Sequence, residues 1–214
     1  MSDLSNYRKS YEKSQLLESE IPEDPMALFK KWFHEVEDFG GVEEVNAMTV
    51  STIGLDGFPK SRVVLLKQFN FEGFTFYTNY HSEKGRAIAE NPHLCLSFFW
   101  HSMERQVIIK GIAEKSPENI SDGYFESRPN GSKLGAIVSN QSEVIASRDV
   151  LEEKLYSLEE SYKGKEIPRP EYWGGYTVKP VEIEFWQGRP NRLHDRIRYK
   201  INKDYSWQID RMAP

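Results

Sequence analysis

Hydrophobic positions recur at three- and four-residue spacing near the start of the chain, after a polar and charged stretch of about 20 residues. Asp24-Pro25 is typical of a helix start, because the aspartate can cap the first turn and proline suits the first helical position. Leu28 and Trp32 mark one face of the helix that follows, and Gly40-Gly41 ends it. The pattern predicts a polar N-terminal arm over residues 1–20 and an amphipathic helix after it.

Between residues 46 and 115 the pattern changes to alternation and short apolar runs, which are typical of β-strands. Asp56-Gly57 is a hairpin-turn signal within this region. Strand-rich blocks separated by short helices favour an antiparallel α+β barrel with flanking helices over a βαβ sheet. Strands are expected over 48–51, 62–67, 74–77, 94–100, 106–113 and from 176 onward, and further helices over 82–90, 117–127, 133–138 and 147–162.

No repeat or low-complexity linker interrupts the sequence, so residues 21–214 are expected to form a single domain. The net charge of -5 argues against general nucleic-acid binding, and no apolar run of about 18 residues is present to span a membrane. The N-terminus lacks a secretory signal, and Cys95 is the only cysteine. The histidines show no metal-ligand spacing. We therefore expect a cytoplasmic protein without a disulfide or a metal site.

Basic residues occupy every second position of the segment from residue 192 to 200. If this segment is one strand, a single face presents Arg192, His194, Arg196, Arg198 and Lys200 with no acid among them. Such a row either protects an exposed strand from edge pairing or contacts an anionic ligand, and the pattern alone leaves both interpretations open. The net charge disfavours a nucleic acid as that ligand.

A second group of polar residues surrounds a Pro-Asn-Gly sequence. Tyr124 and Arg128 would share a helix face, Pro129 would end that helix, and Ser132 can cap the next one. A phenol, a guanidinium and a helix N-terminus together can bind a phosphate. An ordinary turn between two helices explains the same pattern, so both interpretations stand.

Arg62 and Lys67 bracket an apolar run and are five residues apart, which places them on opposite faces of a regular strand. No glycine-rich nucleotide loop is present, so side chains would have to hold any nucleotide-like cofactor. Gln106 and Gln141-Ser142 can offer neutral hydrogen bonds to a heteroaromatic ring, or they only satisfy backbone groups.

Taken in order, these segments resemble the pyridoxine 5′-phosphate oxidase family from about Tyr7 to the C-terminus. The most specific are Glu-Phe-Trp-Gln at 184–187 and Arg-Leu-His-Asp-Arg at 192–196, supported by the sequences at 62–67, 76–79, 104–107, 124–129 and 173–176. The resemblance implies an FMN-binding split β-barrel of Greek-key type and a homodimer with FMN at the subunit interface. It also implies oxidation of pyridoxine or pyridoxamine 5′-phosphate by O2 to pyridoxal 5′-phosphate and H2O2, in vitamin B6 synthesis and salvage.

The resemblance assigns roles to matching positions. Arg192 and His194 correspond to catalytic residues over the substrate ring, where Arg192 positions the substrate and His194 either accepts a proton or only orients the substrate. Positions that match substrate contacts are Arg8, Tyr11, Lys67, Tyr124, Arg128, Ser132, Arg192 and His194. Positions that match FMN contacts are Arg62, Val63, Val64, Leu65, Leu66, Lys67, Tyr77, Thr78, Lys84, Gln106, Gln141, Ser142, Trp186 and Arg196.

One position departs from the family pattern. Where the family has Ser-Arg-Lys, this chain has Ser82-Glu83-Lys84. An acid beside a flavin phosphate would be repulsive, so Glu83 is expected to turn away and Arg86 to compensate for the lost charge. Two other functions remain open: a different split-barrel flavin oxidoreductase, such as a flavin reductase, or a non-catalytic carrier of flavin or pyridoxal phosphate.

Overall fold

The first helix, α1 (Pro25–Phe39), begins and ends where its sequence predicts. The carboxylate of Asp24 accepts a hydrogen bond from the N–H of Met26 at 2.9 Å, and Gly40 ends the helix with a φ of 74° in the left-handed region. In this computed structural model, which describes residues 2–214, the other helices are α2 (Glu83–Glu90), α3 (Glu118–Ser127), α4 (Asn130–Val138) and α5 (Asp149–Ser161). The strands are β1 (Ala47–Ile53), β2 (Pro59–Leu65), β3 (Gln68–Asn70), β4 (Gly73–Asn79), β5 (His93–Trp100), β6 (Arg105–Lys115), β7 (Trp173–Gln187), β8 (Asp195–Ile201) and β9 (Trp207–Arg211).

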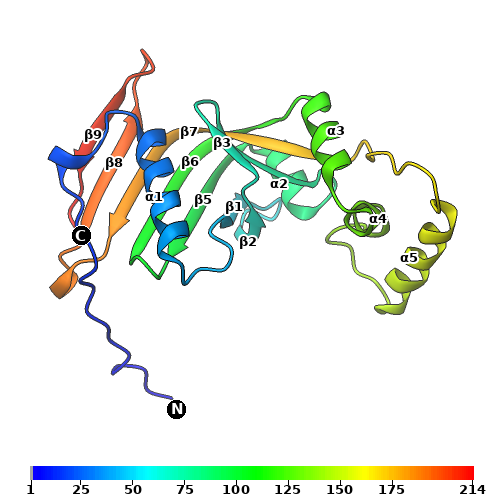
Figure 1. The fold of residues 1–214 in the computed structure, drawn as a ribbon, viewed down its shortest axis with the longest axis horizontal. Helices are drawn as coiled ribbons and strands as arrows, with labels where there is room; N and C mark the ends of the chain where they lie inside the picture. The colour runs from blue at the N-terminus through cyan, green and yellow to red at the C-terminus, as the bar shows by residue number, and fades with distance from the viewer. Residues whose placement is uncertain (1) are drawn as a thin grey trace. The chain divides into compact units, whose positions relative to one another are not determined.

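The strands are hydrogen-bonded in the order β2-β1-β5-β6-β7-β4-β3, and β8 pairs with β7 and with β9 (Figure 1). The pairs β3–β4, β4–β7, β7–β8 and β8–β9 are antiparallel. The alternation in the sequence therefore predicted β1, β2, β4, β5 and β6 with small errors at their ends, but it missed β3 and did not separate β7, β8 and β9. β2 ends at Leu65 rather than at residue 67, and β7 begins at Trp173 rather than at residue 176.

The chain divides into two compact units. The first unit contains the described residues up to Val50, together with Cys95–Gly111 and Pro180–Pro214. Its core forms where α1 packs on the sheet: the ring centroids of Trp32 and Phe185 are 5.2 Å apart. The apolar face that the sequence predicts for α1 is thus the face buried in this core.

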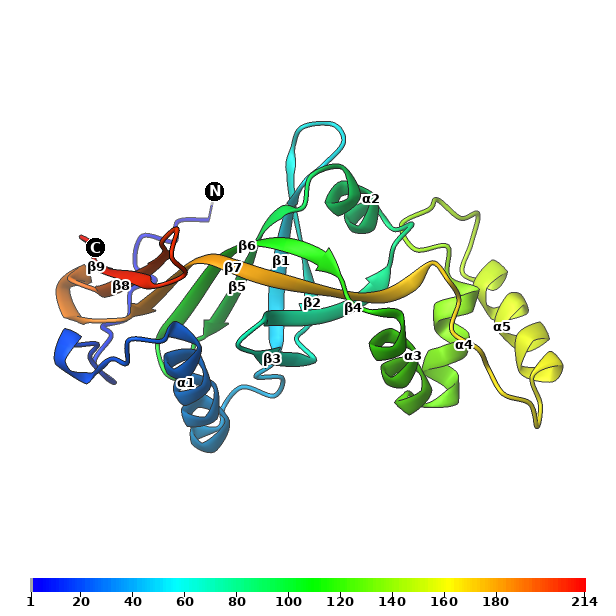
Figure 2. The same cartoon turned by 90° about the horizontal axis from the view of Figure 1, so that it is seen from above.

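The second unit contains Ser51–Leu94 and Ile112–Lys179. A small core of Phe125, Leu134, Ile167 and Trp173 joins α3 and α4 to the start of β7. Figure 2 shows α3, α4 and α5 grouped together beyond the end of β4. This core fixes the short turn between α3 and α4, which carries the predicted phosphate-binding residues. None of the helices within residues 2–214 has the length and apolar character required to cross a membrane.

Candidate functional site

A cavity of about 920 Å³ lies in the second unit, bounded by β2, β4, the start of α2, the α3–α4 turn and the loop after α4. Nearly all residues of this unit that the sequence assigns to FMN or to the substrate phosphate line it. They are Arg62, Val63, Val64, Leu65, Lys67, Tyr77, Thr78, Lys84, Tyr124, Arg128, Ser132, Gln141 and Ser142. The side chain of Leu66 is instead buried in the core, with 3% of its surface exposed.

Lys84 brings a positive charge into this cavity with neutral partners. Its side chain is buried, and its ammonium donates to Oγ1 of Thr78 at 3.3 Å and to Oε1 of Gln141 at 3.1 Å. Burial and, to a smaller extent, nearby Arg62 lower the pKa of Lys84 to about 8. Because hydroxyl and amide oxygens orient the ammonium without neutralising it, an anionic ligand group would be stabilised beside it.

Arg62 and Lys67 both line the cavity, although their spacing predicts opposite strand faces. β2 ends at Leu65, and Lys67 lies beyond it, where its N–H donates to the carbonyl of Thr75 at 2.8 Å. Alternation of side chains holds only within a regular strand. The expectation of opposite faces therefore does not apply to these two residues, because it required a regular strand through residue 67.

Arg128 shows the clearest sign that the cavity receives an anion. Its Nη1 is buried and has no hydrogen-bond partner among the described residues, and its guanidinium lies 4.6 Å from the ring centroid of Trp173. Burial lowers the pKa of Arg128 and nearby Tyr124 opposes this, but a guanidinium stays charged at neutral pH. A buried donor without a partner costs about 1–3 kcal/mol, which an acceptor oxygen from a ligand would offset.

Parallel aromatic rings support this arginine. The ring of Tyr77 stacks on that of Tyr124 with centroids 3.9 Å apart, and on that of Trp173 with centroids 5.5 Å apart. Tyr77 lies on β4, Tyr124 on α3 and Trp173 at the start of β7. The stack therefore fixes the phenol of Tyr124 and the guanidinium of Arg128 on the same wall of the cavity.

Ser132 lies in this wall but does not cap α4. The helix begins at Asn130 after Pro129, without a side-chain cap, and Ser132 falls in the first turn, where its N–H donates to the carbonyl of Pro129 at 2.9 Å. The predicted cap was wrong because α4 begins earlier than its apolar spacing suggests. The hydroxyl of Ser132 still lines the cavity beside the start of the helix.

The expectations for Glu83 and Arg86 were also wrong. Glu83 lines the cavity, and both of its carboxylate oxygens accept hydrogen bonds from the ammonium of Lys60, at 2.7 and 2.5 Å. This pairing holds the pKa of Glu83 below its usual range. Arg86 lines a different cavity of about 460 Å³. Sequence reasoning missed Lys60, whose only signal is its place two residues before Arg62 on β2.

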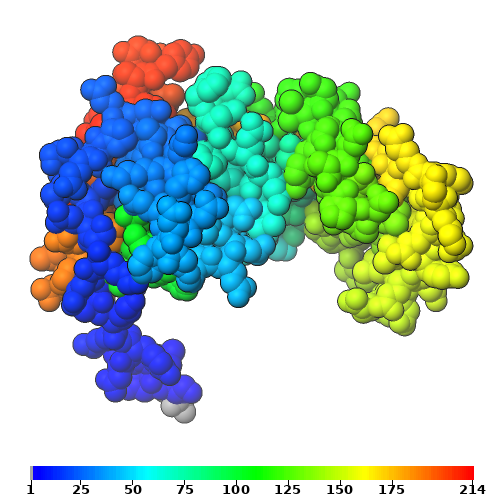
Figure 3. Space-filling view, in the orientation of Figure 1, coloured from blue at the N-terminus to red at the C-terminus, as the bar shows by residue number. Residues whose placement is uncertain are grey.

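A second group of predicted residues lies in the first unit. Arg8, Tyr11, Arg192 and His194 line a cavity of about 710 Å³ between the N-terminal arm and the segment after β7. Figure 3 shows the arm in dark blue beside that segment, which is orange. The arm thus lies beside Arg192 and His194, and its contact with the substrate stays a prediction.

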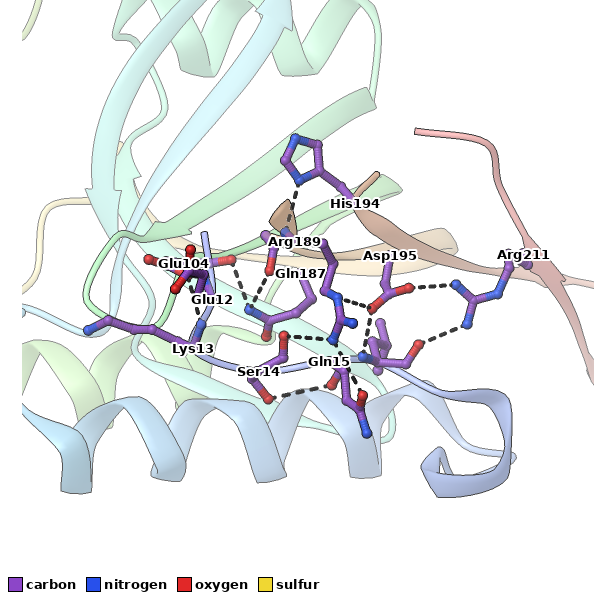
Figure 4. A network of polar contacts seen from close by, with 12 residues as sticks. Glu12, Lys13, Ser14, Gln15, Glu104, Gln187, Arg189, His194, Asp195 and Arg211 are labelled. Atoms are coloured by element: carbon purple, nitrogen blue, oxygen red, sulfur yellow. Dashed lines mark hydrogen bonds and ion pairs between the residues drawn. The ribbon is translucent and has the colours of Figure 1, made fainter. Parts of the chain in front are cut away.

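Buried Glu104 holds the arm in place. Its Oε2 accepts the N–H groups of Glu12 at 2.8 Å and Lys13 at 3.1 Å (Figure 4), and the ammonium of Lys9 pairs with its Oε1 at 3.1 Å. Burial alone would raise the pKa of Glu104, but these contacts lower it overall. Gly188 allows the close approach, because a Cβ there would lie 2.8 Å from Cβ of Tyr11. In the sequence, the one feature near this contact was the Glu-Arg-Gln-Val segment at residues 104–107.

His194 has one ring nitrogen occupied. Its Nδ1 accepts a hydrogen bond from the N–H of Arg189 at 3.0 Å (Figure 4), so the neutral ring carries its proton on Nε2. Burial and the charge of Arg192 lower the pKa of His194 below 6.5, which favours this neutral form. At neutral pH the free side of the ring is therefore a hydrogen-bond donor.

The predicted strand over residues 192–200 was too long. β8 begins at Asp195, and Arg192 lies in a turn with a left-handed φ of 61°, so Arg192 and His194 do not belong to the strand.

Two arginines that do belong to β8 are neutralised by carboxylates of the neighbouring strands. Arg196 forms two hydrogen bonds with Glu184 of β7, at 2.8 and 3.0 Å, and Arg198 pairs with Asp210 of β9 at 2.6 Å.

Gln106, Trp186 and Arg196 lie in the first unit, apart in sequence from the residues that line the larger cavity. The ring of Trp186 is 4.7 Å from that of His194 and 5.7 Å from that of Tyr11. The structure therefore groups Trp186 with the predicted substrate residues of this unit. The contacts of Gln106, Trp186 and Arg196 with FMN stay predictions.

Known proteins share this fold. A solved structure of PhzG from Burkholderia lata, in complex with tetrahydrophenazine-1-carboxylic acid, matches with a TM-score of 0.86 and 28% identity, over 93% of this chain and 98% of that one. A pyridoxamine 5′-phosphate oxidase-related, FMN-binding protein from Nostoc punctiforme matches with a TM-score of 0.71 and 13% identity, over 91% of this chain and all of that one. The sheet and helices thus form an antiparallel α+β split barrel.

Sequence comparison narrows this class. The family model for pyridoxamine 5′-phosphate oxidase matches residues 34–160, and the model for the pyridoxine 5′-phosphate oxidase C-terminal dimerisation region matches residues 173–214. The pyridoxine/pyridoxamine 5′-phosphate oxidase of Flavobacterium psychrophilum is 78% identical over all of both chains, and that of a Nostoc species is 51% identical over 99% of this chain and 98% of its own. The chain belongs to the pyridoxine/pyridoxamine 5′-phosphate oxidase family, so it is an enzyme whose cofactor is FMN.

The residues of the larger cavity suit this cofactor. FMN needs cationic groups for its phosphate, and Arg62 and Lys84 are two cationic residues in the lining of this cavity. The volume of about 920 Å³ falls in the range of small-molecule sites. The unpartnered nitrogen of Arg128 lies in the same cavity, which therefore has donors for a second anionic group.

Proposed function

We propose that this chain oxidises pyridoxine 5′-phosphate or pyridoxamine 5′-phosphate with O2 and forms pyridoxal 5′-phosphate and H2O2. The observation that carries the proposal is the buried Nη1 of Arg128, which has no partner among the described residues and lies in the wall of a cavity that also contains Arg62 and Lys84. One cavity thus offers donors for two anionic groups. An FMN phosphate and a substrate phosphate together meet that requirement.

In this proposal Arg62 and Lys84 bind the FMN phosphate, and Lys67, Tyr124, Arg128 and Ser132 bind the substrate phosphate. Thr78 and Gln141 already orient the ammonium of Lys84 through hydrogen bonds, so little rearrangement is needed when the anion binds. Tyr77 and Trp173 keep the substrate-phosphate residues in place by stacking. Preorganised donors of this kind give selectivity for a phosphorylated substrate.

The chemistry at C4′ of the substrate depends on positioning. FMN supplies, when bound, the two-electron acceptor for this oxidation and the subsequent reaction with O2. Arg192 lies on the surface of the smaller cavity, where its charge can position the substrate. His194 donates a hydrogen bond from Nε2, because the N–H of Arg189 already occupies Nδ1. Of the two roles considered for His194, the structure supports orientation of the substrate.

We further propose a homodimer with FMN at the subunit interface. The C-terminal region that matches the family's dimerisation model, residues 173–214, contains Trp186, Arg192, His194 and Arg196. The same region therefore carries the dimer contacts and the residues assigned to the flavin and the substrate ring. The larger cavity contains none of these four residues. Their supply by a second subunit is the arrangement that the resemblance implies.

A direct assay tests the proposed reaction. Purified protein is saturated with FMN and mixed with pyridoxine 5′-phosphate or pyridoxamine 5′-phosphate in air, and pyridoxal 5′-phosphate and H2O2 are followed together. Equal amounts of both products are expected. Protein that binds FMN but forms neither product would support a carrier. Reduction of the flavin by an added reduced nicotinamide nucleotide, without formation of pyridoxal 5′-phosphate, would support a flavin reductase.

The likeness to PhzG gives one specific competitor. That protein was solved with a tricyclic carboxylic acid, and the guanidinium of Arg128 can also bind a carboxylate. Inclusion of a phenazine carboxylate in the same assay separates the two functions. Turnover only of the phenazine compound would overturn the proposal.

A further inference from the structure

The Lys60–Glu83 pair lies at the edge of the larger cavity, in the second unit. The ammonium of Lys60 donates to both carboxylate oxygens of Glu83, at 2.7 and 2.5 Å, and both side chains are partly exposed. Lys60 lies two residues before Arg62 on β2, so the two side chains share one strand face. Nη1 of Arg62 also donates to the carbonyl of Lys60 at 2.8 Å, which fixes their separation.

The charges around this pair are unbalanced. Among the described residues, five basic ones line the cavity, with Lys60, Arg62 and Lys84 at this edge, whereas Glu83 is the one acidic residue in its lining. Asp56 lies near Glu83 but does not line the cavity. Glu83 is the first residue of α2, after the capping hydroxyl of Ser82, and a helix N-terminus favours an anion. The carboxylate of Glu83 thus occupies a position in which negative charge is stabilised. A phosphate monoester, with about two negative charges at neutral pH, would balance the remaining excess.

We propose that Lys60 is a further ligand of the FMN phosphate in this chain, held at the cavity edge by Glu83 until the cofactor binds. This inference rests on the proposed FMN site and adds a residue to it. The ammonium of Lys60 has three donors and a flexible stem, so it can contact a phosphate while it stays close to Glu83. A surface ion pair without a ligand role would contribute little to stability and nothing to the selectivity between FMN and riboflavin.

Flavin binding to the apoprotein tests the role of Lys60. Wild type and Lys60→Met are titrated with FMN and with riboflavin, which lacks the phosphate, and quenching of flavin fluorescence gives each Kd. Lys60→Met should weaken FMN binding at least tenfold and change riboflavin binding less than twofold. Lys179→Met is the matched control, because Lys179 forms an exposed ion pair with Glu114 at 2.6 Å outside the cavity. The control should leave both affinities unchanged.

A second pair of variants separates a Lys60–phosphate contact from simple exposure of Glu83. Glu83→Gln removes the acid, so the effect of Lys60→Met in that background cannot arise from repulsion by the carboxylate. FMN binding should still weaken severalfold between Glu83→Gln and the double variant Lys60→Met/Glu83→Gln. No change in that background, or an equal loss for riboflavin, would overturn the role of Lys60. Wild type that binds FMN no better than riboflavin would instead overturn the phosphate site itself.

Discussion

His194 illustrates how one hydrogen bond bears on the role proposed for a residue. With Nδ1 accepting the N–H of Arg189, the neutral ring has its proton on Nε2 and lacks a free acceptor nitrogen. The lowered pKa keeps the ring neutral at pH 7. A general base would need the opposite tautomer. The sequence showed only that a titratable ring lies between Arg192 and Arg196, so the proposed preference for a donor over a base rests on the position of Arg189.

Substitution of His194 by asparagine tests this role. Asparagine keeps a hydrogen-bond donor, so kcat/KM for pyridoxine 5′-phosphate should fall by less than about 10²-fold, the lower bound for loss of general-base catalysis. The pH profile above 6.5 should keep its shape, because the wild-type ring is neutral there. Steady-state kinetics from pH 6 to 9 measure both quantities. A loss of 10³-fold or more in kcat/KM, together with the loss of an acid limb that the wild-type pH profile shows, would instead support His194 as a general base.

Single residues of the larger cavity were predicted with uneven success. Arg62, Lys84 and Arg128 lie in motifs whose residue types suit a phosphate, and the structure places all three around one cavity. Lys60 and Glu83 could not be paired from the sequence, since they are 23 residues apart on different elements. Such contacts depend on tertiary packing, which alternation and spacing do not encode.

At the scale of elements, the N-terminal arm depends on a contact that no local pattern reveals. Residues 9–13 have no regular structure, and buried Glu104 holds them by two backbone hydrogen bonds and one ion pair. The pKa of Glu104 is lowered overall, so this contact stabilises the folded protein above the ordinary glutamate pKa of 4.5. That stability is lost as the pH falls and Glu104 becomes protonated.

Gly188→Ala should release the arm. The added Cβ would lie 2.8 Å from Cβ of Tyr11, and overpacking of this kind costs about 1–3 kcal/mol, so the undocked population should increase roughly fivefold or more. Tryptic cleavage after Arg8, Lys9 or Lys13 measures that population. Gly123→Ala is the control, because Gly123 lies in α3 and a Cβ added there would have no neighbour within 4 Å among the described residues. Equal cleavage of wild type and Gly188→Ala would show that the arm does not depend on this approach.

Element boundaries were predicted less well than element types. The strand expected from Arg192 onward begins only at Asp195, because Asn191 and Arg192 both adopt left-handed φ values, of 57° and 61°. Alternating basic residues look the same in a strand and in a turn that leads into one. Asparagine adopts left-handed backbone conformations more readily than most residues, but arginine does not indicate one. The start of β8 at Asp195 could therefore be found only from the structure.

At the scale of the whole molecule, the predicted catalytic and binding residues fall into two groups. Arg62, Lys84 and Arg128 belong to the second unit, and Arg192 and His194 belong to the first. The sequence predicted the members of both groups but gave no sign of this division, because each strand-rich block has the same local pattern. The division agrees with the proposal that a homodimer completes each site.

Subunit mixing tests the shared site. Arg128→Ala should impair the larger cavity and Arg192→Leu the C-terminal region, so each homodimer should have low activity. If each site uses the larger cavity of one subunit and the C-terminal region of the other, one site of every mixed dimer contains neither substitution. Random reassortment should then restore about a quarter of wild-type activity. Activity no greater than the average of the two parents would show that each subunit has a complete site of its own.

The most direct test of the central proposal is selectivity for the substrate phosphate. The specificity constants of the FMN-loaded enzyme are compared for pyridoxine 5′-phosphate and pyridoxine, in wild type, in Arg128→Ala and in the control Arg148→Ala, whose arginine lies outside the cavity. Wild type and the control should prefer the phosphorylated substrate by about a thousandfold or more, since charged hydrogen bonds contribute about 1.5–3 kcal/mol each. Arg128→Ala should reduce this preference, because it should lower the specificity constant for pyridoxine 5′-phosphate and leave that for pyridoxine unchanged. Equal use of both substrates by the wild type would contradict the proposed phosphate site.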